Sequence, residues 1–372
     1  METRAAVLWN VGEEWKIENI TLDDPGPGDV LVEMKVAGMC HSDEHVVTGD
    51  MLMPHYPCIG GHEGAGVVLA VGSHVTSVEV GDHVSMSFIP SCGRCKYCAS
   101  GRQNLCNEGA KLFDLGMMSD GRVAHHIAGT DTPASRMCQV GTFAEHVLVS
   151  ENSVVKVDKD LPWHAVALVS CGVATGYGSA VHRAGVKPGD NVAVVGCGGI
   201  GMNAVQGAKL AGAKRVIAID PVEFKREQAM EFGATHTFSS IEEAMATVPD
   251  LTWGDMCDAV ILTVGVMTGD LVQPALDLTA KGGTVVMTSV ANMMEGEVTL
   301  NSFTFAMLNK ELKGSLFGSG NPRYDIPELL SMYREGDIKL DELVTKRYTL
   351  DQVNEGYEAM RAGENLRGII EF

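Results

Sequence analysis

The sequence predicts an α/β protein in which a strand-rich first domain is followed by a doubly wound parallel-sheet domain. Three observations predict this class. Residues 1 to about 170 are rich in glycine and short β-branched runs, an apolar run then leads into a G-x-G-x-x-G turn, and strands alternate with helices beyond it. The chain has 372 residues, which is enough for two domains that each bury a core.

The first domain is expected to consist of short strands joined by tight turns. Strands are predicted in the runs AAVLW, DVLVEMKVAGM, GAGVVLAVG and DHVSMSF. Turn sequences such as Pro25-Gly26-Pro27-Gly28 and Gly81-Asp82 separate them. Residues 109–140 are polar and contain glycine, which predicts a surface loop rather than a core element.

The second domain is expected to begin with a βαβ unit. Residues 191–195 predict a short apolar strand, a glycine turn follows, and residues 199–211 and 215–220 predict a helix and a second strand. Further alternation predicts a helix at 223–232 and strands at 259–264 and 283–289. The last part of the chain predicts a loop at 318–322, helices at 326–334 and 350–361, and a closing strand at 368–372.

Charge and composition exclude several classes of partner. The chain carries 48 acidic and 28 basic side chains and a net charge of −20, which argues against nucleic acid and anionic membranes. The N-terminal run METRAAVLWNVGEEW does not pair a basic segment with an apolar one, and no apolar run reaches about 18 residues. We therefore expect a cytoplasmic protein whose ten cysteines are thiols or metal ligands rather than disulfides.

Four cysteines with the spacing C-x2-C-x2-C-x7-C predict a zinc site: Cys92, Cys95, Cys98 and Cys106. Four thiolates complete a tetrahedral zinc, so such a site stabilises structure and leaves no position for chemistry. The alternative is a disulfide cluster, which the expected compartment disfavours.

The glycine turn predicts a dinucleotide site because it follows a strand and opens a helix. Its residues are Gly196, Cys197, Gly198, Gly199, Ile200 and Gly201. The first glycine permits the tight turn, the second lets a pyrophosphate approach the backbone, and the third lets the helix pack on the strand. Asp220 ends the next strand, where a carboxylate binds ribose hydroxyls and repels a 2′-phosphate, and Glu223 adds to that repulsion. NAD is therefore expected over NADP.

Three further residues are candidate metal ligands, and each taken singly could equally be a core residue. Cys40 lies in GMCHSDEH, His62 in GGHEGAG, and Cys171 in VSCGVATGYG. The pattern G-H-E-x2-G-x5-G around His62 strengthens the ligand interpretation.

All these features together resemble the zinc-dependent medium-chain alcohol dehydrogenases, and the resemblance extends to the closing sequence LRGIIEF. It implies a GroES-like β-rich catalytic domain at 1–171 with a structural zinc lobe at about 90–107. It further implies a Rossmann NAD-binding domain at 172–314 and a return to the catalytic domain at 315–372, with the active site between the domains.

In the family, residues that match Cys40, His62 and Cys171 hold a catalytic zinc with one open position. The family chemistry is hydride transfer from a zinc-bound alkoxide to NAD, which oxidises a primary alcohol reversibly to an aldehyde. Ser42 matches the hydroxyl beside the alcohol oxygen. His45 matches a proton carrier near the surface, linked through the nicotinamide ribose.

The resemblance also assigns supporting residues. Asp43 matches the acid that orients the zinc-bound histidine, and Glu63 a buried carboxylate behind the metal. The remaining matches concern NAD: Thr175 and Val290 at the nicotinamide, Arg367 at the pyrophosphate, and Lys225 near the adenosine ribose, for which a solvated lysine is the alternative. His41 stands where an arginine often pairs with the pyrophosphate, so that contact is expected to be weaker and dependent on pH.

Several stretches, among them IPSCGRCKYC and FGSGNPRYDIPELLSMY, resemble the actinobacterial NDMA-dependent alcohol dehydrogenases. Members of that group are often nicotinoproteins, which keep NAD bound and pass electrons to an external acceptor such as the redox carrier mycofactocin. The alcohol channel is expected to be wide and apolar and to suit medium-chain or aromatic alcohols. Its expected lining is Leu52, Phe88, Met117, Met118, Phe143, Met293 and Met294, although the methionines could equally be core or loop residues.

Two other functions remain open at this point. A thiol-dependent formaldehyde dehydrogenase shares the zinc layout but would need a basic patch that the sequence does not clearly show. A non-enzymatic NAD-binding protein is disfavoured because every ligand and relay residue is present. The family forms homo-oligomers. Cys58, Cys138 and Cys257 are expected to pack in the core, and alkylation of Cys197 in the glycine turn could block NAD.

Overall fold

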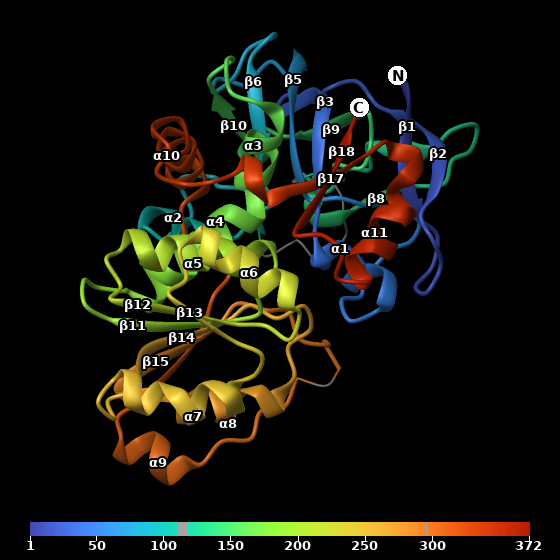
Figure 1. The fold of residues 1–372 in the computed structure, drawn as a ribbon. Coiled ribbons are helices and arrows are strands. Elements are labelled where there is room, and N and C mark those ends of the chain that lie inside the picture. The colour runs from blue at the N-terminus through green and yellow to red at the C-terminus, as the bar shows by residue number, and fades with distance from the viewer. Residues whose placement is uncertain (110–117, 119, 295) are drawn as a thin grey trace. The chain divides into compact units, whose positions relative to one another are not determined.

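The computed structural model describes residues 1–109, 118, 120–294 and 296–372. Its contacts divide the chain into two compact units. Unit 1 comprises Met1–Cys171 and Asn321–Phe372, and unit 2 comprises Gly172–Gly320. Unit 1 is rich in strands and unit 2 alternates strands with helices, as the predicted fold class requires (Figure 1).

Unit 1 is built on two sheets. One has the strand order β7-β2-β1-β4-β8, and the other the order β10-β6-β5-β3-β18-β17, with β9 also paired to β3. The strands are β1 (Glu2–Leu8), β2 (Lys16–Leu22), β3 (Asp29–Met39), β4 (Cys58–Ile59), β5 (Glu63–Val71), β6 (His83–Met86), β7 (His125–Ile127), β8 (Ser135–Arg136), β9 (His146–Ser150), β10 (Val154–Val157), β17 (Val344–Tyr348) and β18 (Arg367–Glu371). The helices are α1 (His41–Thr48), α2 (Lys96–Ala99), α3 (Trp163–Leu168), α10 (Pro322–Glu335) and α11 (Val353–Arg361).

The register of three neighbouring strands gathers distant parts of the sequence at one end of the larger sheet. In the antiparallel pairs, Gly38 of β3 faces Glu63 of β5, and Met39 faces Gly368 of β18. The end of β3 therefore lies between the start of β5 and the start of β18. Cys40 follows β3 directly, so the sheet brings it close to His62, Glu63 and Arg367.

Unit 2 is a parallel sheet with helices on both faces. The strand order is β13-β12-β11-β14-β15-β16, which is the 3-2-1-4-5-6 order of a doubly wound dinucleotide-binding fold. In Figure 1, α5 and α6 lie on one face and α7 and α8 on the other. The elements are α4 (Ala174–Gly178), β11 (Asn191–Val195), α5 (Gly199–Leu210), β12 (Arg215–Ile219), α6 (Glu223–Phe232), β13 (His236–Phe238), α7 (Ile241–Leu251), β14 (Cys257–Leu262), α8 (Val272–Leu278), β15 (Thr279–Met287), α9 (Ser302–Met307) and β16 (Glu311–Gly314).

A continuous helical run, Trp163–Ala184, joins α3 and α4 through a π-helical segment, Val169–Val173. By length and composition this helix could cross a membrane, but 83% of its apolar window is buried inside the protein, as in a core helix. Cys171 lies in the π-helical segment, where the extra residue per turn changes the direction of its side chain. Such π-bulges occur often at functional sites.

The expectation of a surface loop at 109–140 is wrong for the part that the structure describes. That part contains β7, β8 and a short 3₁₀ turn, Met137–Gln139. Met118, Ala124 and Leu148 form a small apolar cluster there, and Arg136 is only 1% exposed. Arg136 can be buried because it donates to the backbone carbonyls of Gln139 and Leu148, so its guanidinium has partners without water.

Candidate metal centre and dinucleotide site

Asp43 connects the start of α1 to the segment that carries the predicted histidine ligand. Its Oδ2 accepts the backbone N–H of Cys40 at 3.2 Å. Its Oδ1 accepts the N–H of Gly61 at 3.1 Å and lies 3.0 Å from Nδ1 of His62. An ionised carboxylate only accepts hydrogen bonds, so Nδ1 of His62 carries the proton and Nε2 presents a lone pair.

A buried cluster of metal-binding side chains lies on the other side of that imidazole. One ligand atom each from Cys40, His62, Glu63 and Cys171 lies within 4.8 Å of the others. Nε2 of His62 is buried and has no hydrogen-bond partner among the described residues, which would cost about 1–3 kcal/mol if nothing bound there. Two sulfurs and an imidazole nitrogen are a ligand set of catalytic zinc. The residues therefore fit a zinc ion.

The charges around this cluster also favour a cation. A hydrogen bond with Cys171 lowers the pKa of Cys40 well below its usual value, although burial opposes this, and the same bond together with burial raises the pKa of Cys171. Burial would lower the pKa of His62, but Asp43 and the two sulfurs outweigh it and raise that pKa well above its usual range. The negative charges that favour protons on these groups would also favour the binding of a divalent cation in place of protons.

Glu63 is ion-paired with Arg367 behind the cluster. Both side chains of this pair are buried, since Glu63 is 0% exposed and Arg367 is 4% exposed. Burial raises the pKa of Glu63, and the charge of Arg367 opposes that rise. The assignment of Arg367 to the pyrophosphate stays a prediction; its contact within unit 1 is with Glu63.

The predicted proton path starts beside the cluster. Oγ of Ser42 lies 3.8 Å from Sγ of Cys40. The side chain of His45, which is expected near the surface, is only 2% exposed. The chain reverses at Gly49 after α1, and Oδ2 of Asp50 lies 3.3 Å from Nδ1 of His45. The ring of His41 lies 6.0 Å from that of His45 between centroids, and His41 is half-buried.

The residues expected to line the alcohol channel divide into different environments. Phe88 meets the ring of His62 edge-on at 5.6 Å between centroids, so it borders the metal-ligand cluster. Phe143 is 0% exposed and packs against Trp15 and Tyr357, so its assignment to the channel is wrong. Of the others, Met118 is buried, at 3% exposed. Leu52, Met293 and Met294 lie on the surface, at 44%, 54% and 80% exposed, and Met117 lies outside the described residues.

The four closely spaced cysteines meet in a lobe of unit 1. The sulfurs of Cys92, Cys95, Cys98 and Cys106 lie within 4.8 Å of one another. Cys92 and Cys98 have a sulfur–sulfur distance of 4.0 Å, close to the roughly 3.8 Å that tetrahedral Zn–S bonds of about 2.3 Å require. Backbone N–H groups of Cys98 and Asn107 lower the pKa of Cys95 to about 6. None of the ten cysteines is in a disulfide, so the disulfide alternative is not supported.

The glycine turn of unit 2 has the geometry that a dinucleotide site needs. Gly196 has a φ of 93°, which reverses the chain after β11. A side chain at Gly201 would lie 1.9 Å from the carbonyl oxygen of Gly196, so α5 can approach the strand only with glycine there. A side chain at Gly198 would meet no atom within 4 Å, so space is open above the start of α5. Gly199 and Ile200 form the first turn of that helix.

The carboxylate of Asp220 lies beside this turn, as the motif requires. Its Oδ2 accepts the N–H of Cys197 at 2.8 Å and its Oδ1 that of Val222 at 2.9 Å. Thr175 is buried, whereas Val290 and Lys225 are half-buried.

Cys197 itself is 0% exposed, and burial raises its pKa to about 12, so the thiol is shielded in the native protein; that its alkylation would block NAD stays a prediction. Its sulfur points into the fold toward the carbonyl of Ile219. Burial likewise raises the pKa of Cys58 and Cys257 to about 12 and that of Cys138 to about 11, which agrees with a packing role.

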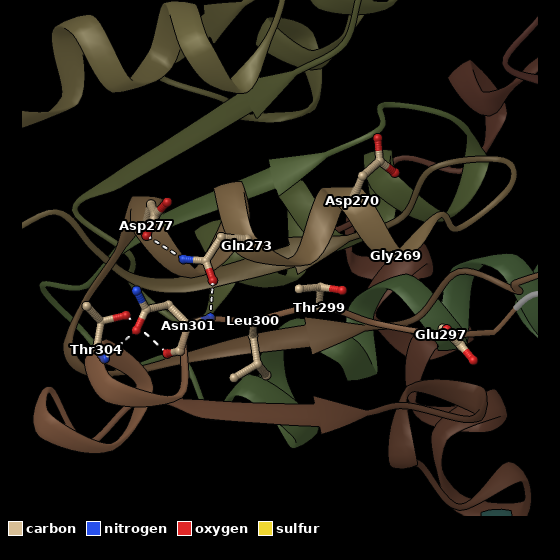
Figure 2. Close-up of a pocket in the computed structure, with 9 residues that line it drawn as sticks. All are labelled: Gly269, Asp270, Gln273, Asp277, Glu297, Thr299, Leu300, Asn301 and Thr304. Carbon is tan, nitrogen blue, oxygen red and sulfur yellow. Dashed lines mark hydrogen bonds between the residues drawn. The ribbon is translucent and has the colours of Figure 1, made fainter.

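Unit 2 also contains an open hollow of about 790 Å³ beside α8 and α9 (Figure 2). Three carboxylates line it, those of Asp270, Asp277 and Glu297. Gln273 donates to Asp277 at 2.8 Å and accepts the N–H of Asn301 at 2.6 Å, so these polar groups bind one another. None of the predicted site residues lines this hollow.

Two protein-family models match the chain. The alcohol dehydrogenase GroES-like domain matches residues 26–159, and the zinc-binding dehydrogenase matches residues 199–335.

Several alcohol dehydrogenases are similar to this chain over its whole length. The chain is 53% identical over 370 residues to the NDMA-dependent alcohol dehydrogenase of Amycolatopsis methanolica, covering 100% of this chain and 99% of the relative. It is 46% identical over 372 residues to alcohol dehydrogenase B of Mycobacterium tuberculosis, with the same coverage. Among solved structures, benzyl alcohol dehydrogenase from Acinetobacter calcoaceticus is 29% identical with a TM-score of 0.91, covering 100% and 99% of the two chains.

Proposed function

The chain belongs to the zinc-dependent medium-chain alcohol dehydrogenases, and we propose that it oxidises primary alcohols to aldehydes, reversibly, with NAD as the hydride acceptor. The observation that carries this proposal is the buried, unpartnered Nε2 of His62 among the sulfurs of Cys40 and Cys171. That arrangement supplies three protein ligands and leaves a fourth position for substrate. The proposed domain roles are catalysis for 1–171 and 315–372 and NAD binding for 172–314, although residues 315–320 belong to unit 2 in the structure.

Cys40, His62 and Cys171 would hold the catalytic zinc. Zinc in such a site is a Lewis acid that lowers the pKa of the substrate hydroxyl. Asp43 keeps Nε2 of His62 in the ligand tautomer, and the Glu63–Arg367 pair places balanced charges behind the ligands. Phe88 forms an apolar border beside His62, which favours apolar alcohols.

Proton removal would use Ser42 and His45. The hydroxyl of Ser42 is close enough to Cys40 to reach a substrate oxygen at the ligand cluster. His45 would receive the proton on its imidazole ring and later release it to solvent.

NAD is favoured over NADP by the carboxylate of Asp220, which lies at the glycine turn and would repel a 2′-phosphate. The four-cysteine lobe would hold a second, structural zinc, so we propose two zinc ions per chain. The free thiols support a cytoplasmic location, and the family relationship supports a homo-oligomer.

The 53% identity to an NDMA-dependent enzyme supports a finer proposal. In that proposal NAD stays bound through turnover, and electrons pass to an external acceptor such as mycofactocin. The net charge of −20 disfavours nucleic acid and anionic membranes as partners.

The experiment that tests this proposal measures nucleotide release and turnover on the same preparation. The protein is dialysed exhaustively and denatured, and the released nucleotide is identified. About one NAD or NADH per chain, with alcohol oxidation that requires an added acceptor dye, is the expected result. If no nucleotide were bound and added NAD drove turnover, the alcohol dehydrogenase function would stand. The proposal that NAD stays bound through turnover would be refuted. Oxidation of formaldehyde only with added thiol would instead support the formaldehyde dehydrogenase function.

A further inference from the structure

Asp50 occupies a position that the sequence motifs do not assign. It follows α1 by two residues, and the intervening Gly49 has a φ of 83°, in the left-handed region that glycine adopts readily. The N–H groups of Gly49 and Met51 both donate to the carbonyl of His45, at 3.1 and 2.9 Å. The chain therefore turns back at the end of α1, and Asp50 faces the side chain of His45.

The carboxylate of Asp50 makes two contacts with α1 through the same oxygen. Oγ1 of Thr48 donates to Oδ2 at 2.7 Å, and Nδ1 of His45 lies 3.3 Å from that oxygen. The imidazole is 2% exposed and the carboxylate 19% exposed. Asp50 therefore lies between a buried imidazole and water.

This contact determines which nitrogen of His45 can accept a proton. An ionised carboxylate has no proton to donate, so the hydrogen bond requires that Nδ1 carry the hydrogen. The neutral ring then presents Nε2 as a base. The same relation holds between Asp43 and His62, where the carboxylate contacts Nδ1 and leaves Nε2 for a metal.

We infer that Asp50 is a positioning residue for proton removal: it holds His45 in the tautomer whose Nε2 accepts the alcohol proton, and its charge balances the imidazolium that forms. This inference rests on the proposed function. In the step, the proton from the substrate hydroxyl binds Nε2, the ring becomes an imidazolium beside the Asp50 carboxylate, and a base in solvent later takes one proton and restores the neutral ring.

Other ionisable groups of α1 do not replace Asp50. The ring of His41 is 6.0 Å from that of His45 and carries no negative charge. Glu44 is paired with Arg361 of α11 at 2.6 Å, so its charge is already balanced.

The test compares Asp50→Asn and Asp50→Ala with the parent enzyme under saturating alcohol. Loss of the carboxylate should lower kcat by about tenfold, since a positioned acid–base group as a whole contributes roughly 10² to 10⁴. Added imidazole buffer should restore much of the rate in the variants and have little effect on the parent. Asp50→Asn preserves the size of the side chain and separates loss of charge from loss of folding.

Two further measurements complete the test. Asp23→Asn is the matched control, because it removes a carboxylate that lies 3.8 Å from another histidine, His126, outside the site. This variant should have the kcat of the parent, and added imidazole should not change that kcat. Nitrogen NMR of ¹⁵N-histidine protein, with the His45 signal assigned by its loss in His45→Gln, reports the tautomer without turnover. The expected result is protonated Nδ1 in the parent and mixed tautomers in Asp50→Ala.

Unchanged kcat, no rescue and an unchanged tautomer in Asp50→Ala would overturn the inference. A parent enzyme that oxidises no alcohol would overturn the proposed function instead, and the NMR measurement would still decide whether Asp50 sets the tautomer.

Discussion

The two clusters of metal ligands in unit 1 are built in opposite ways. The four-cysteine lobe takes its sulfurs from one short stretch, residues 92–106, and two of them, Cys92 and Cys95, are only half-buried. The cluster of Cys40, His62 and Cys171 takes its ligands from three segments far apart in sequence, and all are buried. The lobe can form from local contacts, whereas the buried cluster needs the finished sheet.

This difference corresponds to a difference in chemistry. Four sulfurs fill a tetrahedral site, so the lobe can only stabilise the fold. The buried cluster adds an imidazole oriented by Asp43 and a balanced pair of charges, Glu63 and Arg367. A site assembled from the core can exclude water and keep one position open, and those two properties are what Lewis-acid catalysis requires.

The largest expected effect comes from removing a sulfur of the buried cluster. Cys40→Ala or Cys171→Ala should lower alcohol turnover by roughly a thousandfold or more, because two protein ligands do not hold a catalytic zinc well. NAD binding should survive, since the glycine turn and Asp220 belong to unit 2. Turnover and the amount of NAD bound per chain, measured on the same protein, report both. If turnover persisted with one zinc fewer per chain, the buried cluster would not be the catalytic site.

The next effect separates stability from catalysis. Cys98→Ala should remove the zinc of the lobe and lower the midpoint of thermal unfolding by roughly 5–10 °C, for a loss on the order of 3 kcal/mol. The protein that still folds should retain most of its turnover per catalytic zinc. Scanning calorimetry with metal analysis measures this, and Arg94→Ala, at a lobe side chain that is 85% exposed, is the control. Equal unfolding midpoints for Cys98→Ala and the parent would refute the structural-zinc assignment.

A smaller effect is expected at the hydrogen bond behind the imidazole. Asp43→Asn should weaken zinc binding at the buried cluster and lower activity by about 10–100-fold, as loss of such a partner typically does. Zinc content after dialysis should fall from two per chain toward one, with the lobe still occupied. Asp82→Asn removes a different buried carboxylate, one that pairs with Lys156, and should leave both zincs in place. A variant that kept both zincs and full turnover would show that Asp43 is not needed.

Local patterns in the sequence predicted local structure well. Strand β11 at 191–195 and helix α6 at 223–232 were predicted to the residue, because an apolar run, a glycine turn and a capped helix are each set by neighbouring residues. The four-cysteine lobe was predictable for the same reason. Cys40, His62 and Cys171 could be grouped only through resemblance to a family, since their proximity depends on strand register.

What the sequence did not predict depends on tertiary packing or on a reversal of the chain. Phe143 was expected in the channel, yet it is covered by Trp15 and Tyr357, which come from opposite ends of the chain. The assignment of Arg367 to the pyrophosphate stays a prediction, whereas its contact with Glu63, 304 residues away, has no signal in the sequence. Asp50 was missed because its spacing from His45 fits no helical repeat; only the glycine before it indicated a reversal of the chain.

The smallest expected effect is a difference in the rates at which the two clusters lose zinc to a chelator. Cys92 and Cys95 are half-buried, while Cys40 and Cys171 are each 5% exposed or less, so a thiol reagent with a chelator should reach the lobe first. Mass spectrometry of alkylated peptides over time should show modification of the lobe peptides before those that contain the buried cysteines, and before Cys197. The first zinc should leave with little loss of turnover and a clear loss of thermal stability, and the second with loss of turnover. If activity disappeared with the first zinc, local unfolding would open the buried cluster as readily as the lobe, and burial would not distinguish the two sites.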